Sequence, residues 1–197
     1  MIARLCIGLA TAVLAACGSS PRPTLHTLAE EVRAAAPMKA GVSIAVMAAS
    51  LPEAHDRLQI VVRGKDNRLL VIDQQRWSEP LRQEIARQVA TDLGCRLGSG
   101  GVVALPEDVQ SLDPGYRLLL DVQRLDASLT EGVGVDVAWR LVARDGKVYP
   151  GRSVQLEPVG VAGDAPYTAL AAAYRRAFGR VSADVATLLG GLPSAAR

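Results

Sequence analysis

The 197-residue chain carries 22 lysine and arginine residues against 20 aspartate and glutamate residues, which gives a formal net charge of +2. This balance supports neither nucleic-acid binding, which needs a basic stripe, nor a polybasic membrane patch. The length suits one domain with a substantial core. Because aromatic residues make up only 4% of the chain, we expect Leu, Val, Ile and Ala to fill that core.

The first residues have the pattern of a bacterial export signal. Arg4 precedes an apolar stretch, Leu5 to Val13, that is shorter than the roughly 20 residues needed to span a bilayer. Leu14-Ala15-Ala16-Cys17 closes this stretch and resembles a lipobox. The resemblance implies that residues 1–16 are a signal peptide and that Cys17 carries a diacylglycerol on its thiol and an acyl chain on its new amine. The alternative is an ordinary secretory signal that contains a cysteine.

The residues after Cys17 indicate where such an anchor would be held. Gly18 and Ser19 lack the aspartate that retains lipoproteins at the inner membrane, so the resemblance implies the periplasmic face of the outer membrane. Residues 17–24 contain Gly, Ser and Pro and predict a flexible tether behind the lipidated cysteine. Residues 25–193 then form a single domain.

Alternating apolar residues predict the first strands of this domain. They lie at 42–46 and 58–63, and a third strand at 69–72 follows a turn at 64–67. The short turn predicts that the second and third strands form a hairpin.

An amphipathic helix follows these strands. Apolar residues recur at every fourth position from Leu81 to Leu93, whereas Glu84 belongs to the polar faces. Ser78 is a candidate N-cap, and Gly94 is a candidate C-terminal stop.

The second half of the domain predicts further strands and a closing helix. A short apolar run at 102–104 precedes strands at 116–125, 133–141 and 148–156, with Asp145-Gly146 as a hairpin turn and Pro150 indicating an edge strand. A last helix opens at Asp164 and Pro166 and ends at Gly190-Gly191. The order predicts an α+β fold with two layers, in which two amphipathic helices pack on one face of a mainly antiparallel sheet.

The sequence offers little chemistry. His26 and His55 are not in a metal-ligand spacing, and we expect both to be solvated. Cys95 is the one cysteine left after Cys6 and Cys17, so no intramolecular disulfide can form, and we expect a half-buried apolar residue there. No Gly-x-Ser-x-Gly motif is present. We therefore predict that the protein is not an enzyme and that it holds no metal or cofactor besides its acyl chains.

Two segments carry a resemblance to a known family. Asp56-Arg57-Leu58-Gln59-Ile60-Val61 and Arg76-Trp77-Ser78-Glu79-Pro80-Leu81 resemble the ABC-type transport auxiliary lipoproteins of the PqiC-like group, as does the later Tyr116-Arg117-Leu118. The similarity runs over roughly Leu25 to Leu189. The family often begins with a Tyr-x-Leu motif, where this chain has Leu25-His26-Thr27-Leu28.

The resemblance implies a non-catalytic subunit of an MCE-type (mammalian-cell-entry) intermembrane phospholipid transport system. It would dock or stabilise the periplasmic MCE-domain protein at the outer membrane, and it could assemble into a homo-oligomeric ring. A stand-alone lipid carrier, which would need a large apolar cavity, and an activator of a cell-wall enzyme, which would need a long tether, are the alternatives.

The motif residues also have a structural interpretation. Trp77 is placed to act as a hydrophobic staple against Leu81 or its neighbours. Arg57, Arg76 and Glu79 could form ion pairs that lock the second strand to the start of the helix. Asp56, Arg57, Arg76, Trp77 and Glu79 are therefore candidates for either fold maintenance or partner contact.

Overall fold

The computed structural model describes residues 22–29, 42–105, 113–160 and 165–192, so that the predicted signal peptide, Cys17 and Asp164 lie outside the described residues. The described elements are, in chain order, β1 (Thr24–His26), β2 (Ile44–Met47), the 3-10 helix η1 (Glu53–His55), β3 (Gln59–Arg63), β4 (Leu69–Trp77), α2 (Leu81–Leu97), β5 (Val102–Leu105), β6 (Tyr116–Ser128), β7 (Gly132–Ala143), β8 (Val148–Glu157) and α3 (Pro166–Gly191).

The strands form two sheets. A five-stranded sheet has the order β5-β2-β6-β7-β8, and a three-stranded sheet has the order β1-β4-β3. The long ladders β6–β7, β7–β8 and β3–β4 are antiparallel, whereas β2 is parallel to β5 and β6, and β1 is parallel to β4. The α+β class is confirmed, but the strands divide into two sheets where we expected one. Parallel pairs arise because the chain leaves β2, makes the β3–β4 hairpin and α2, and then returns beside it in the same direction.

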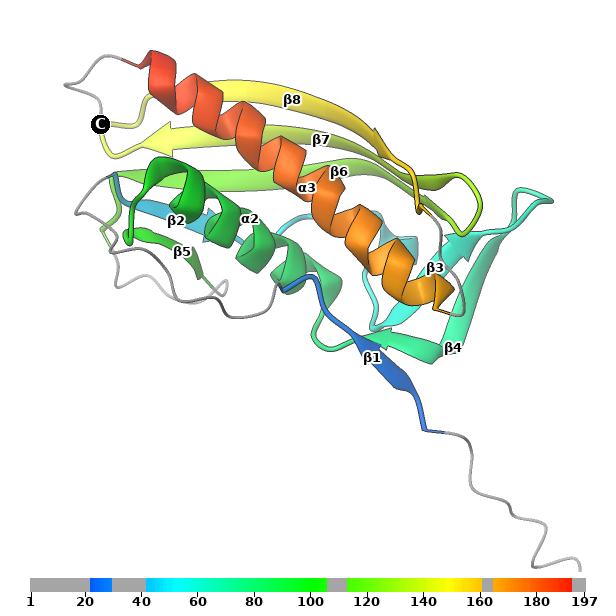
Figure 1. Cartoon of the computed structure of the whole chain (residues 1–197). Helices are drawn as coiled ribbons and strands as arrows, with labels where there is room; N and C mark the ends of the chain where they lie inside the picture. Colours follow the sequence, from blue (N-terminus) through cyan, green and yellow to red (C-terminus); the bar gives the residue numbers. More distant parts are fainter. Residues whose placement is uncertain (1–21, 30–41, 106–112, 161–164, 193–197) are drawn as a thin grey trace, which may run out of the picture.

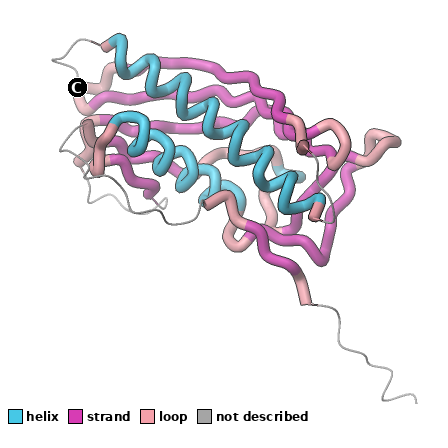
Figure 2. The backbone as a smooth tube through the Cα atoms, in the orientation of Figure 1, coloured by secondary structure: helices cyan, strands magenta, loops and turns pink. Residues whose placement is uncertain are grey.

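Helices α2 and α3 lie side by side on one face of the five-stranded sheet, as predicted (Figures 1 and 2). Helix α2 covers β2 and β5, and α3 covers β7 and β8. Their apolar faces and the inner face of the sheet form one core, whose largest fully buried side chains include Tyr174, Phe178, Leu93 and Leu141. Among the described residues, no helix has the length and apolar character needed to cross a membrane.

The ends of α2 differ from the sequence prediction. The helix begins after Pro80, so Ser78 is not its N-cap. It continues through Gly94, which is buried within it, and ends at Gly98, whose φ of 59° is left-handed. A glycine adopts this conformation without a steric penalty, so Gly98 closes the helix, whereas Gly94 lies buried inside it.

Strand β8 is an edge strand, as Pro150 predicted. Its Gly151 lies directly opposite Trp139 of β7. A Cβ added to Gly151 would lie 2.1 Å from the indole ring, so only glycine fits at this position. The Trp139 Nε1–H donates to Ser153 Oγ at 3.1 Å, and the Ser153 hydroxyl donates to Asp184 of α3 at 2.5 Å. This chain of hydrogen bonds fixes the last helix on the edge of the sheet.

A second contact holds the same helix. Glu157, which is buried at the end of β8, forms ion pairs with Arg176 and Arg180 of α3. A buried carboxylate needs such partners because it has lost its water.

Candidate functional site

The five candidate residues of the first two family-like segments lie at one end of the molecule. Asp56 and Arg57 follow η1, and Arg76, Trp77 and Glu79 lie at the junction of β4 and α2. This end also holds β1, where the described chain begins, whereas the last turns of α3 lie at the opposite end (Figure 1). We call it the tether-proximal end.

The charged motif residues form other pairs than those we expected. Asp56 pairs with Arg82 of α2 at 3.6 Å, and Glu79 pairs with Arg87 at 2.7 Å. Arg76 Nε donates to the carbonyl oxygen of Asp73 at 3.0 Å. Glu79, which precedes α2, therefore pairs with a residue in the second turn of that helix instead of locking a strand. These pairs are partly exposed and are each worth about 0–1 kcal/mol, so they set geometry more than stability.

Trp77 belongs to the core. Its side chain is 2% exposed, and its ring packs edge-to-face against Tyr174 of α3, with ring centroids 5.1 Å apart. Because α2 starts only at Leu81, Trp77 lies too early in the chain for the hydrophobic staple that we expected. It instead joins the end of β4 to the second helix, which gives it a role in fold maintenance.

The tether-proximal end contains a buried carboxylate, that of Glu84, which we expected on a polar face of the helix. Glu84 of α2 is 2% exposed. Its Oε1 accepts a hydrogen bond from Ser78 Oγ at 2.5 Å, and its Oε2 accepts from Thr27 Oγ1 and from the Leu28 amide, both at 3.0 Å. Hydrogen bonds to an ionised group are the strong ones. Glu84 therefore fastens the segment after β1 and the β4–α2 junction to the helix.

The β1 segment is also tied to β4. His26 Nε2 lies 2.6 Å from Gln75 Oε1, the Ser78 amide donates to the His26 carbonyl at 2.7 Å, and the His26 ring faces Tyr167 of α3. His26 is buried, so the expectation of a solvated histidine is wrong. Its sequence position suggested a tether, but the parallel pairing of β1 with β4 draws it into the domain.

His55 is buried as well, against the same expectation. It lies on η1, next to β6. Burial lowers the pKa of His55 below its ordinary value of 6.5, and the nearby Arg57 lowers it further, while Asp126 and a backbone hydrogen bond to Leu125 oppose the shift. The folded protein therefore favours the neutral imidazole.

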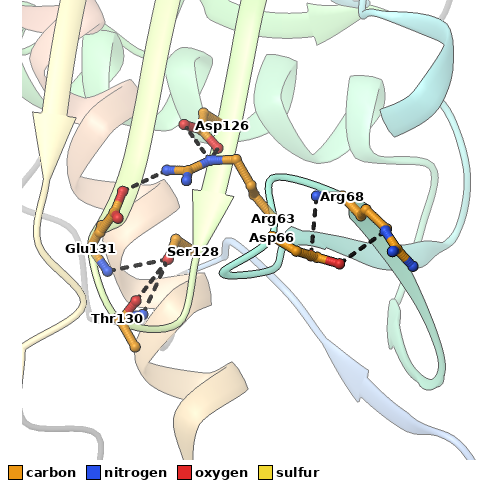
Figure 3. A network of polar contacts seen from close by, with 7 residues as sticks. All are labelled: Arg63, Asp66, Arg68, Asp126, Ser128, Thr130 and Glu131. Atoms are coloured by element: carbon orange, nitrogen blue, oxygen red, sulfur yellow. Dashed lines mark hydrogen bonds and ion pairs between the residues drawn. The ribbon is translucent and has the colours of Figure 1, made fainter.

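The β3–β4 hairpin is joined to the turn between β6 and β7 (Figure 3). Arg63 Nε donates to Asp126 at 2.8 Å, and its terminal nitrogen donates to Glu131 at 2.5 Å. Hydrogen bonds to these two carboxylates raise the pKa of Arg63, with Asp126 contributing most. A depression of about 300 Å³ lies between the two turns, with Lys65, Leu70 and Leu129 in its lining.

The described residues give no constellation typical of catalysis. Within them, no group of three or more His, Cys, Asp or Glu side chains could hold a metal ion. Cys95 is a free and exposed thiol near the end of α2, so the expected half-buried position is wrong. The helix continues past Gly94, which leaves Cys95 on its outer side.

The comparisons with known proteins fit this arrangement. The family model described as "ABC-type transport auxiliary lipoprotein component" matches residues 24–186. A crystal structure of an uncharacterized protein is similar with a TM-score of 0.66 and 16% identity, over 86% of this chain and 99% of that one. A Xanthomonas campestris protein of the DUF330 family is similar with a TM-score of 0.58 and 20% identity, over 85% and 93% of the two chains. Among curated proteins, none matches this chain.

Replacing Glu84 should loosen the β1 segment. In Glu84→Leu the buried Leu28 amide loses its acceptor, which costs about 1–3 kcal/mol of unfolding free energy. Glu84→Gln keeps one acceptor oxygen and should cost less. Urea unfolding measures both values, and limited proteolysis near residues 24–29 measures the loosening. Equal stability of the wild type and Glu84→Leu would contradict the assigned role.

Acidification should destabilise the protein through His55. Because its folded pKa lies below 6.5, the unfolded chain takes up the proton first, so the free energy of unfolding falls as the pH drops below about 6.5. Urea unfolding at about pH 7.5 and about pH 5.5 measures this loss. We expect a smaller loss in His55→Gln, and a loss as large as in the wild type would show that another group is responsible.

Proposed function

This chain belongs to the ABC-type transport auxiliary lipoprotein family, and we propose that it is a non-catalytic, outer-membrane subunit of an MCE-type intermembrane phospholipid transport system. Its role would be to dock or stabilise the periplasmic MCE-domain protein where that bridge reaches the outer membrane. The observation that carries the proposal is the family match over residues 24–186, directly after the lipobox that ends at Cys17. Lipoproteins of this kind are held at a membrane by their acyl chains.

The packing of the domain favours a role as a scaffold over a role as a lipid carrier. A carrier would need an apolar cavity for an acyl chain, and the natural place is between the helices and the sheet. That space holds the side chains of Leu170, Tyr174, Phe178 and Val181 of α3, all buried in one core with those of α2 and the sheet.

The length of the tether supports a partner that comes to the membrane. Only six residues lie between Cys17 and Thr24, the first residue of β1. Such a tether extends at most about 25 Å, which is too short to carry an activator across the periplasm to a cell-wall enzyme. We also propose that several copies assemble into a ring around the end of the bridge, and the native mass of the purified lipoprotein tests this.

Removal of the lipidated thiol tests the anchor. Cys17→Ala should leave the domain folded, because the residue precedes β1, but it should move the protein from the membrane fraction to the soluble periplasmic fraction. Cys95→Ser is the matched control, since it removes a thiol and leaves the lipobox intact. Unchanged fractionation of Cys17→Ala would contradict the lipid anchor.

Crosslinking in cells tests the partner. After crosslinking and solubilisation of the membranes, we expect a periplasmic MCE-domain protein to co-purify with the wild type and to decrease with Cys17→Ala. Recovery of a cell-wall synthase in its place would favour the activator alternative.

A further inference from the structure

The start of β4 exposes three consecutive aliphatic side chains. Leu69, Leu70 and Val71 are 50%, 45% and 42% exposed. Successive residues of a strand point to opposite faces, so β4 exposes apolar side chains on both of its faces here, although Val61 and Val62 opposite them in β3 are buried. Clustered exposed apolar residues of this kind mark a binding surface for another protein or a membrane.

Two of these side chains, Leu69 and Val71, share a face of the hairpin with Arg63 and Val61, their partners in β3. Ile72, the next residue, packs against the core. Leu69 and Val71 lie on the opposite face of the strand from Ile72, because they differ from it by an odd number of residues. Lys65 and Arg68 are exposed in the adjoining turn, where Arg68 pairs with Asp66 at 2.9 Å. The apolar pair therefore has charged residues beside it.

The tether places this hairpin close to a bilayer. It spans at most about 25 Å between the lipidated Cys17 and Thr24. Strand β1 pairs directly with β4, and the hairpin extends from the body at the end of the molecule where the chain enters β1 (Figure 1). The parallel register means that the chain enters β1 from the side on which β4 begins. With the proposed lipid anchor at Cys17, the three-stranded sheet would be held near the membrane through the pairing of β1 with the end of β4.

We propose that the β3–β4 hairpin rests on the phospholipid bilayer, with Leu69 and Val71 in the interfacial region and Lys65 at the level of the lipid phosphates. A lysine can bury its stem along apolar surface and keep its ammonium group in the polar layer. The proposal rests on the lipid anchor of the proposed function, and it adds a second, non-covalent contact that orients the domain.

The hairpin is built to hold a fixed position. Arg63, the last residue of β3 before the hairpin turn, joins the hairpin to Asp126 of β6 and Glu131 of the β6–β7 turn (Figure 3). A hairpin held in this way would fix the orientation of the long strands relative to the bilayer. Membrane contact would then set the angle at which the domain meets its partner.

A pair of matched labels tests the contact. In a Cys95→Ser background, Leu69→Cys and Val148→Cys are each labelled with an environment-sensitive fluorophore. The two native side chains are equally exposed, at 50% and 49%, but Val148 starts β8 at the end of the molecule away from β1 (Figure 1). The lipidated proteins are reconstituted in phosphatidylethanolamine and phosphatidylglycerol vesicles.

We expect a blue shift and a loss of iodide quenching for the label at position 69, and neither change at position 148. Co-flotation with vesicles but equal quenching at both positions would overturn the proposal and leave the anchor standing. A protein that does not float with the vesicles contradicts the anchor, and with it the hairpin contact. A label at position 69 that is already shielded in the vesicle-free Cys17→Ala variant would show that protein covers this surface, which also overturns the proposal.

Discussion

The arrangement of the tether-proximal end depends on one buried carboxylate. Glu84 has lost almost all of its solvent and must be satisfied by protein donors, which come from Thr27, Leu28 and Ser78. These donors belong to two segments far apart in the sequence, the chain after β1 and the junction of β4 with α2. The hydrogen bonds that Glu84 needs therefore hold the segment after β1 and the start of α2 in fixed positions.

Further contacts connect this junction to α3 and to the five-stranded sheet. Trp77, one residue before Ser78, packs its ring against Tyr174 of α3, and Glu157 holds the same helix to β8 through Arg176 and Arg180. A force applied through the tether would therefore be transmitted from β1 to α2, to α3 and to the five-stranded sheet. Such a connected domain suits the scaffold role that we propose for this transport auxiliary lipoprotein.

Much of the fold could be predicted from local patterns. Alternating valines located β7, the apolar residues at every fourth position located α2, and Pro150 identified β8 as an edge strand. The patterns did not reveal the second sheet, because the pairing of β1 with β4 joins residues about fifty positions apart. Gly94 was mistaken for a helix end because local sequence does not distinguish a glycine needed for packing from one needed for a left-handed cap, which Gly98 supplies.

The sequence by itself determined the α+β class, the order of the strands and α-helices from β2 onward, and the family resemblance carried by the segments at Asp56 and Arg76. Only the tertiary structure decided which polar residues matter: it buried His26, His55 and Glu84, which a periodicity argument leaves in solvent. The physical reason is that hydrophobic periodicity reports which face of an element is buried by its neighbours. The cost of burying a charge or an imidazole is met by partners distant in the chain, and those become visible only when the chain has folded.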